Sequence, residues 1–209
     1  LLQYMDQATA ARVLEEIQPD IRKILVKSLG ADRAISVMSK MSVDELVDLI
    51  QLLPGREARE IVGKLPIDSK TQKIKRILEY DEDTAGGLMT TEFLSAESNT
   101  SVADVIERIR DVSHLHRSIY FVYILDKSGK FRGVASLRNL IIAQPNQTMK
   151  DIMKRAKQIP SAAPSDDLAS VAAVMTKYNL LSIAVLDSRD MLLGIVTVDD
   201  IMRRLVPDA

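Results

Sequence analysis

Two acidic residues, Asp44 and Asp48, stand four positions apart in a segment with a helical pattern of apolar residues. At this spacing both carboxylates lie on one face of a helix, where like charges repel and a divalent cation would relieve the repulsion. The alternative is solvation. Asp44 would occupy the first helical turn, where the helix macrodipole favours an acid, and Asp48 would face water. From spacing alone, the solvated pair is the better interpretation.

A second pair of acids, Asp199 and Asp200, opens the last predicted helix. Residues 197–200 read Thr-Val-Asp-Asp, which is the spacing of a capping box in which Thr197 and Asp200 bind each other's backbone N–H groups. This structural role is the leading interpretation of Asp200. The same oxygens suit a nucleotide or a Mg²⁺ ion, so these two alternatives stay open.

A third acidic group, Asp81, Glu82 and Asp83, precedes Gly86 and Gly87 in the joint at residues 80–91. The two glycines predict an end to the helical pattern and a hinge with positive φ. A solvated charge run is the usual explanation for such acids. A divalent cation that bridges the hinge to a neighbouring element is the alternative, with Asp83 as the candidate ligand.

No catalytic constellation is evident, and we expect no enzyme. The sequence has no nucleophile elbow, no phosphate-binding glycine loop with Lys and no Cys. His114 and His116 have no further ligands nearby and are interpreted as solvated loop residues.

Composition excludes further classes. Basic residues number 28 and acidic residues 29, so no nucleic-acid footprint is expected. No apolar run approaches the roughly 18 residues of a membrane helix, and the absence of Cys fits a reducing compartment. The chain begins at Leu1 rather than Met, which suggests a piece of a longer protein.

The first 80 residues predict a series of short helices. Apolar residues recur at steps of three and four, and breaks at Pro19, Gly30, Ser42, Pro54 and Pro66 fall about a dozen residues apart. Such a series predicts a small superhelix. Residues 42–45, Ser-Val-Asp-Glu, predict a capping box at one helix start.

The remaining residues contain one unit twice. Residues 126–139 and 187–200 share Asp, Gly and Ser or Thr at an offset of 61 positions. Each copy predicts a short strand, a helix, two strands joined by a hairpin and a final helix. Expected strands are 93–94, 119–125, 131–135, 182–186 and 191–196, and expected helices are 101–111, 137–142, 166–178 and 198–205. The fold class is therefore α+β, with a helical domain at 1–85 and two repeats at 86–148 and 149–209.

This repeat resembles a tandem pair of cystathionine-β-synthase (CBS) domains, whose signature is Gly-apolar-x-Ser/Thr-x-x-Asp. Gly194, Thr197 and Asp200 complete the signature in the second copy, whereas the first has Ser136 but Asn139 in place of Asp. The junction at residues 80–93 resembles that of MgtE-type magnesium channels. Residues 41–54 resemble the N-terminal domain of the same family, so the resemblance covers essentially the whole chain.

The resemblance implies a cytosolic region that senses Mg²⁺ and gates a membrane pore absent from this chain. It implies a homodimer formed through the CBS pair, at the cytoplasmic face of the membrane. Apolar helix faces, with Val171, Val174 and Met175 among them, suggest the surface that the second subunit covers. The implied metal ligands are Asp44, Asp48, Asp199, Asp200 and Asp83. For an adenine nucleotide, the implied contacts are Thr197, Asp200, Ser136 and Asn139.

Some residues depart from the family pattern. Arg203 and Arg204 stand in a helix that is acidic in typical relatives, and Asn179 stands where an acid is expected. Asn is a poorer Mg²⁺ ligand than a carboxylate, and Arg repels the ion. The alternative functions are a stand-alone CBS module that binds an adenine nucleotide and regulates a partner, and a helical adaptor whose CBS pair only dimerises.

Overall fold

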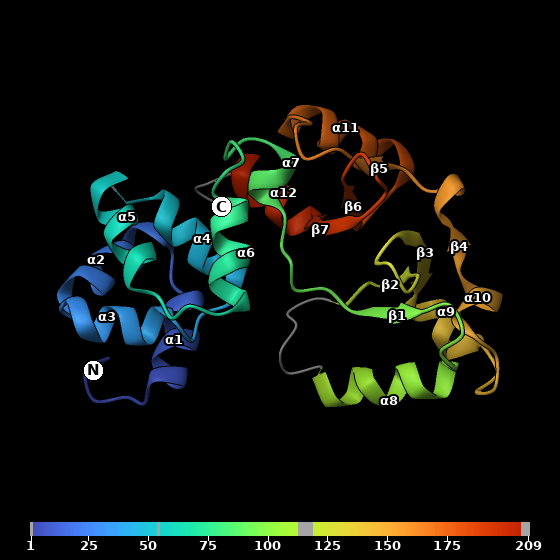
Figure 1. Ribbon diagram of the computed structural model, residues 1–209, viewed down its shortest axis with the longest axis horizontal. Helices are drawn as coiled ribbons and strands as arrows, with labels where there is room; N and C mark the ends of the chain where they lie inside the picture. The colour runs from blue at the N-terminus through green and yellow to red at the C-terminus, as the bar shows by residue number, and fades with distance from the viewer. Residues whose placement is uncertain (1, 54, 113–118, 206–209) are drawn as a thin grey trace. The chain divides into compact units, whose positions relative to one another are not determined.

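The chain divides into two units, Leu1–Glu82 and Asp83–Ala209, where the sequence predicts a division after residue 85 (Figure 1). The computed structural model describes residues 2–53, 55–112 and 119–205. Helices make up the first unit, and helices and strands the second. The predicted α+β fold class, with its helical part first, is confirmed.

Short helices form the first unit, as the apolar rhythm predicts. They are α1 (Gln7–Glu15), α2 (Pro19–Ser28), α3 (Ala31–Met38), α4 (Val43–Gln51), α5 (Gly55–Lys64) and α6 (Ser69–Ile77). The inward residues of these helices make a core of aliphatic and Met side chains, among them Leu14, Met38, Leu46, Ile50 and Ile74, each at most 2 % exposed. Packing of these faces holds the unit together, because isolated helices of eight to ten residues are unstable in water.

The start of α4 corrects one detail of the prediction. Ser42 is the N-cap of α4, as expected. The predicted capping box is wrong, because the Ser42 side chain makes no cap hydrogen bond at this helix start. The Ser42 N–H donates instead to the Glu15 carboxylate at 2.6 Å, and Glu45 accepts from Arg22 at 2.6 Å.

The second unit repeats the predicted β-α-β-β-α pattern. In the first copy, β1 is followed by α8, the β2–β3 hairpin and α9. The second copy has β5, α11, the β6–β7 hairpin and α12. A short helix, α7 or α10, precedes each copy. The bounds are α7 (Ala85–Leu88), β1 (Ser95–Glu97), α8 (Val102–Val112), β2 (Phe121–Leu125), β3 (Phe131–Ser136), α9 (Leu137–Ile142), α10 (Met149–Ile152), β4 (Lys154–Arg155), η1 (Ala156–Gln158), β5 (Ser161–Ala162), α11 (Leu168–Tyr178), β6 (Ser182–Leu186), β7 (Leu192–Thr197) and α12 (Val198–Leu205).

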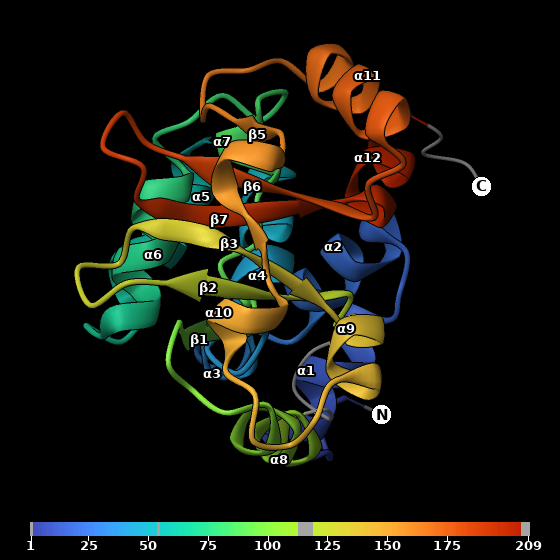
Figure 2. The ribbon, with the colours of Figure 1, turned by 90° about the vertical axis from the view of Figure 1, so that its right-hand side faces the viewer.

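The two copies build two sheets, ordered β1-β2-β3-β4 and β5-β6-β7. In each sheet the first strand pairs parallel with the hairpin, and the hairpin strands pair antiparallel. Helix α8 lies on the outer side of the first sheet, and α11 and α12 lie on the outer side of the second (Figure 2). Alternating residues of β2 serve both sides. Val122 and Ile124 join the core under α8, whereas Tyr123 packs with Ala184 and Ile195 between the sheets.

Two expectations about the joint are corrected. The first strand begins at Ser95 rather than at Phe93, because Ser95–Glu97 provides the parallel pairing with β2. Gly86 and Gly87 form no positive-φ hinge. They are buried within α7, where the Gly86 N–H donates to the carbonyl of Pro164 at 2.9 Å. The joint at these glycines is therefore packed against the second copy.

Candidate functional site

Helix α4 carries the first predicted metal pair. Asp44 is the second residue of α4, and its side chain lies outside the described set. Asp48 follows one turn later and is exposed. The i, i+4 spacing is therefore realised within one helix, and the exposed Asp48 carboxylate is chemically suited to a hydrated cation.

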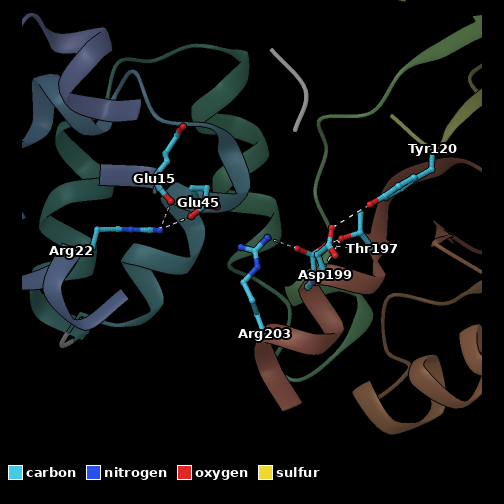
Figure 3. Close-up of polar contacts among 8 residues, drawn as sticks. Glu15, Arg22, Glu45, Tyr120, Thr197, Asp199 and Arg203 are labelled. Atoms are coloured by element: carbon cyan, nitrogen blue, oxygen red, sulfur yellow. Dashed lines mark hydrogen bonds and ion pairs between the residues drawn. The ribbon is translucent and has the colours of Figure 1, made fainter. Parts of the chain in front are cut away.

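A buried ion pair fixes the start of α4 (Figure 3). Arg22 in α2 and Glu45 in α4 are 4 % and 2 % exposed, and their charged atoms lie 2.6 Å apart. Nη1 of Arg22 makes this contact, and Nη2 donates to the carbonyls of Glu15 and Ile17, at 2.9 and 3.2 Å. Because a buried charge is tolerated only with partners, this network ties α1, α2 and α4 to one another.

The second copy of the repeat forms the predicted capping box at the start of α12. Asp200 accepts from the Thr197 N–H at 2.9 Å and from its hydroxyl at 2.6 Å. The Asp200 N–H in turn donates to the Thr197 hydroxyl at 3.3 Å. Arg203, one turn later in α12, lies 3.5 Å from the second Asp200 oxygen. The cap interpretation of Asp200 is thus confirmed, and a guanidinium already balances its charge.

A narrow cleft lies beside this capping box. Residues from both copies line it: Glu92, Phe93, Leu94, Ile119, Tyr120, Phe121, Tyr123, Ser182 and Ile195. The Tyr120 hydroxyl reaches the Asp199 carboxylate at 3.5 Å, so it approaches the start of α12 (Figure 3). The cavity volume is about 10 Å³, which is room for about one water molecule.

The first copy of the repeat closes the same motif differently. Ser136 caps α9 by accepting from the Asn139 N–H at 3.2 Å, and its hydroxyl donates to the Asn139 side-chain oxygen. The Asn139 amide nitrogen donates to the carbonyl of Ile152 at 3.1 Å. An Asp could not make this last bond, through which Asn139 ties α9 to α10, the short helix that leads into the second copy.

Asp83 begins the second unit beside α12. Arg204 donates from Nε to one Asp83 oxygen at 3.0 Å, and its Nη2 lies 2.9 Å from the same oxygen. Of the four carboxylates predicted as ligands whose side chains are described, Asp83 and Asp200 thus have an Arg beside them. Each of these two carboxylates therefore already has a cationic neighbour.

The other expected features are quickly placed. Within the described part of the chain, no group of three or more acidic or His side chains is arranged to share a metal ion. His114 and His116 lie outside the described residues. No helix among the described residues is long and apolar enough to cross a membrane.

Each of the two units matches a known protein family. Residues 1–83 match the MgtE intracellular N domain, and residues 85–146 and 149–207 each match the CBS domain. The chain belongs to the MgtE family. The predicted resemblance is confirmed over nearly all of its length.

Individual MgtE proteins are similar to this chain in structure and in sequence. The soluble part of a magnesium transporter superimposes with a TM-score of 0.89 at 30 % identity, covering all of this chain and 81 % of that one. The cytosolic domain of the Mg²⁺ channel MgtE in complex with ATP gives a TM-score of 0.84 at 29 % identity, covering 97 % of this chain and 82 % of that one. Magnesium transporter MgtE of Thermus thermophilus is 31 % identical over the whole chain, which spans 46 % of that relative.

The two tyrosines that line the narrow cleft, Tyr120 and Tyr123, were not identified from the sequence. Tyr120 and Tyr123 lie in a run interpreted only as an apolar strand. Burial raises the pKa of Tyr123 to about 12, partly offset by its bond with the Ser182 hydroxyl at 2.7 Å. The hydroxyl groups of two tyrosines in an otherwise apolar run are the signal that could have drawn attention to them.

Proposed function

We propose that this chain is the cytosolic regulatory region of an MgtE-type magnesium transporter, which senses Mg²⁺ and gates a membrane pore formed outside these residues. The observation that supports it most directly is the colinear match of the whole chain, N domain before CBS pair, to the soluble part of a magnesium transporter at a TM-score of 0.89. The region would act as a homodimer at the cytoplasmic face of the membrane.

In this proposal Asp44 and Asp48 of α4 supply the carboxylates for the ion. Two like charges a few ångströms apart cost on the order of 1 kcal/mol even when they are partly solvated. A bound Mg²⁺ removes that cost and keeps several of its own waters. The ion favours the conformation for which its affinity is higher, so any closing of the region depends on that difference in affinity.

Small-angle scattering on the full chain, with and without millimolar Mg²⁺, tests this proposal. We expect the radius of gyration to fall with Mg²⁺ and the fall to disappear in the double variant Asp44→Asn, Asp48→Asn. A matched control is Asp104→Asn with Glu107→Gln, which removes two exposed acids from α8. A radius unaffected by Mg²⁺, or a response that survives in the α4 variant, would contradict the assignment.

A second function, binding of an adenine nucleotide by the CBS pair, is supported by the intact Thr197 and Asp200 of the second copy. The solved MgtE cytosolic domain that this chain resembles holds ATP. In CBS proteins the Asp accepts from ribose hydroxyls, and the residue before Asp200, Asp199, accepts from the hydroxyl of Tyr120, which lines the cleft. Because the cleft has only about 10 Å³ of free volume, a nucleotide has to push its side chains apart.

Calorimetry with ATP, AMP and adenosine tests the nucleotide site. We expect Asp200→Asn to weaken binding by about tenfold or more, since a hydrogen bond to a charged acceptor is lost. The variant should stay folded, because the first copy already closes its cap with Ser136 and Asn139. Asn139→Ala is the control and should leave affinity unchanged. The opposite pattern would assign the nucleotide to the first copy, and no binding to either would favour an adaptor role.

A further inference from the structure

Arg204 joins the first residue of the second unit to the last helix. Its guanidinium donates one hydrogen bond to Asp83 at 3.0 Å and forms an ion pair with the same oxygen at 2.9 Å, and the two side chains are 37 % and 65 % exposed. The backbone continues this contact. The Asp83 carbonyl accepts from the Leu168 N–H at 3.0 Å, and the Asp166 carbonyl accepts from the Ala85 N–H at 2.8 Å. The segment that leads into the CBS pair is therefore held by the start of α11 and by α12 together.

Arg203 repeats the arrangement one residue earlier. It lies 3.5 Å from Asp200, whose other oxygen is used by the Thr197 cap. Successive arginines of α12 thus each face a different carboxylate. Both of those carboxylates are ones for which the family resemblance implies a divalent ion.

We propose that Arg204 serves as a built-in cation that latches Asp83 to α12, so that this contact forms without a divalent ion. A guanidinium brings a fixed positive charge and N–H donors in a planar fork, which suits a carboxylate. Mg²⁺ requires anionic or neutral oxygen at about 2.1 Å and is repelled by the adjacent charge, so the arginine and the ion exclude each other here. The proposed Mg²⁺ response of this chain then falls to the acids of α4. Only this assignment of the Mg²⁺ response to α4 rests on the proposed function, and the latch itself does not.

Backbone hydrogen exchange on the full chain, with Mg²⁺ removed by a chelator, tests the latch. In Arg204→Gln we expect the Ala85 and Leu168 N–H groups to exchange about twofold to fivefold faster, the range expected for one partly exposed ion pair. Gln keeps the helix propensity of α12, so the change reports on the ion pair. Asp83→Asn should have the same effect, and the double variant should add little to either single one. Arg132→Gln removes a comparable exposed pair with Asp126 and should leave both amides unchanged.

Adding Mg²⁺ separates the latch from the proposed sensing function. In the unmodified chain we expect neither amide to change when Mg²⁺ replaces the chelator. Slowing of these amides by Mg²⁺ would overturn the latch and leave sensing intact. Arg204→Gln without effect in the chelated state would also overturn it. If no part of the chain responds to Mg²⁺ while Arg204→Gln still loosens both amides, the latch stands and the sensing function fails.

Discussion

At the scale of single residues, the Arg22–Glu45 pair is the most constrained feature of the first unit. Both side chains are almost fully buried, and Arg22 also binds two carbonyls at the end of α1. Removing one member of such a pair leaves the other charge buried without compensation, which is costly. The pair also fixes the start of α4, the helix that carries Asp48.

We therefore predict that Arg22→Met destabilises the first unit by about 3–5 kcal/mol. The double variant Arg22→Met, Glu45→Met should lose less than Arg22→Met alone, because Met replaces both charges with apolar groups of similar length. Urea unfolding followed by helical circular dichroism measures both. Lys27→Met is the control, since its pair with Glu57 is 47 % and 45 % exposed and should contribute less than about 1 kcal/mol. Equal losses in Arg22→Met and Lys27→Met would contradict the prediction.

Asn179 shows why residue roles were hard to predict. The resemblance implies an acid there, and its absence looks like the loss of a metal ligand. Asn179 has φ 51° and ends α11 in the left-handed conformation, where Asn is favoured among residues other than Gly. In the same way, Glu45 has the spacing of a capping box but binds Arg22, 23 residues away. Local spacing states which bonds are available, and the tertiary contacts decide which are made.

At the scale of elements, the two hairpins are copies of one turn. An Asp carboxylate accepts two backbone N–H groups of its own turn in each: Asp126 from Ser128 and Lys130 at 2.8 and 3.1 Å, Asp187 from Arg189 and Met191 at 2.8 and 2.9 Å. The 61-residue offset between these acids predicts the equivalence. The turns also meet each other, since Phe131 N–H donates to the Asp190 carbonyl at 2.9 Å.

These turns predict a loss of stability in acid. Hydrogen bonds hold the pKa of both carboxyls below the ordinary 3.8, chiefly from the Ser128 hydroxyl for Asp126 and from the Met191 N–H for Asp187. A carboxyl whose pKa is lower in the folded than in the unfolded protein stabilises the fold at pH values above its pKa in the unfolded protein. This contribution is lost as the pH falls through the pKa of the folded protein. Between about pH 5 and pH 2, the unfolding midpoint of Asp126→Asn, Asp187→Asn should therefore fall less than that of the unmodified chain. If the unfolding midpoints of the variant and the unmodified chain fall equally with pH, other acidic residues cause the loss of stability in acid.

Strands and helices were predicted well where the apolar period is clear. The expected bounds of α9, β6 and α12 agree with the structure. The predicted position of the first strand is wrong because Phe93 and Leu94 are apolar for packing and do not lie in a strand. Phe93 packs edge-on against Tyr123, with ring centres 5.6 Å apart, and Leu94 lies in the core. A three-residue edge strand such as Ser95–Glu97 has too little period to be recognised.

The glycines of the CBS signature also have a physical explanation at this scale. A Cβ on Gly194 would lie 2.7 Å from the carbonyl oxygen of Thr90, whose backbone bonds to Ile195. A Cβ on Gly133 would clash with the carbonyl oxygen of Lys154 in the same way. Each copy thus needs a bare backbone where the segment entering the other copy crosses its hairpin. The sequence shows the repeated Gly, but the crossing partner is visible only in the fold.

At the scale of the whole molecule, the CBS pair leaves apolar side chains in water. Val171 and Met175, with Val174, were predicted to form a face for a second subunit, but Val171 and Met175 are 2 % and 4 % exposed and belong to the interior. The exposed apolar residues lie elsewhere on the helices of both copies and on the loop after α11: Ile141 79 %, Ile142 71 %, Tyr178 53 %, Leu181 46 %, Met202 53 % and Leu205 55 %. Helical period alone could not separate the inner face of α11 from an outer one, because α11 is apolar on more than one side.

These exposed helices lead to the prediction of a homodimer through the CBS pair. Exposed apolar side chains gathered on α9 and α12 are typical of a surface that is covered in an assembly. Light scattering after gel filtration should give about twice the chain mass of 23.2 kDa. Ile142→Glu with Met202→Glu should shift the chain toward monomer, because each puts a charge into the contact without touching the core. Ile67→Glu is the matched control, since Ile67 is 98 % exposed in the first unit and should leave the mass unchanged. A monomer at tens of micromolar would refute the dimer, and a dimer lost in Ile67→Glu but kept in the α9–α12 variant would place the contact in the helical unit instead.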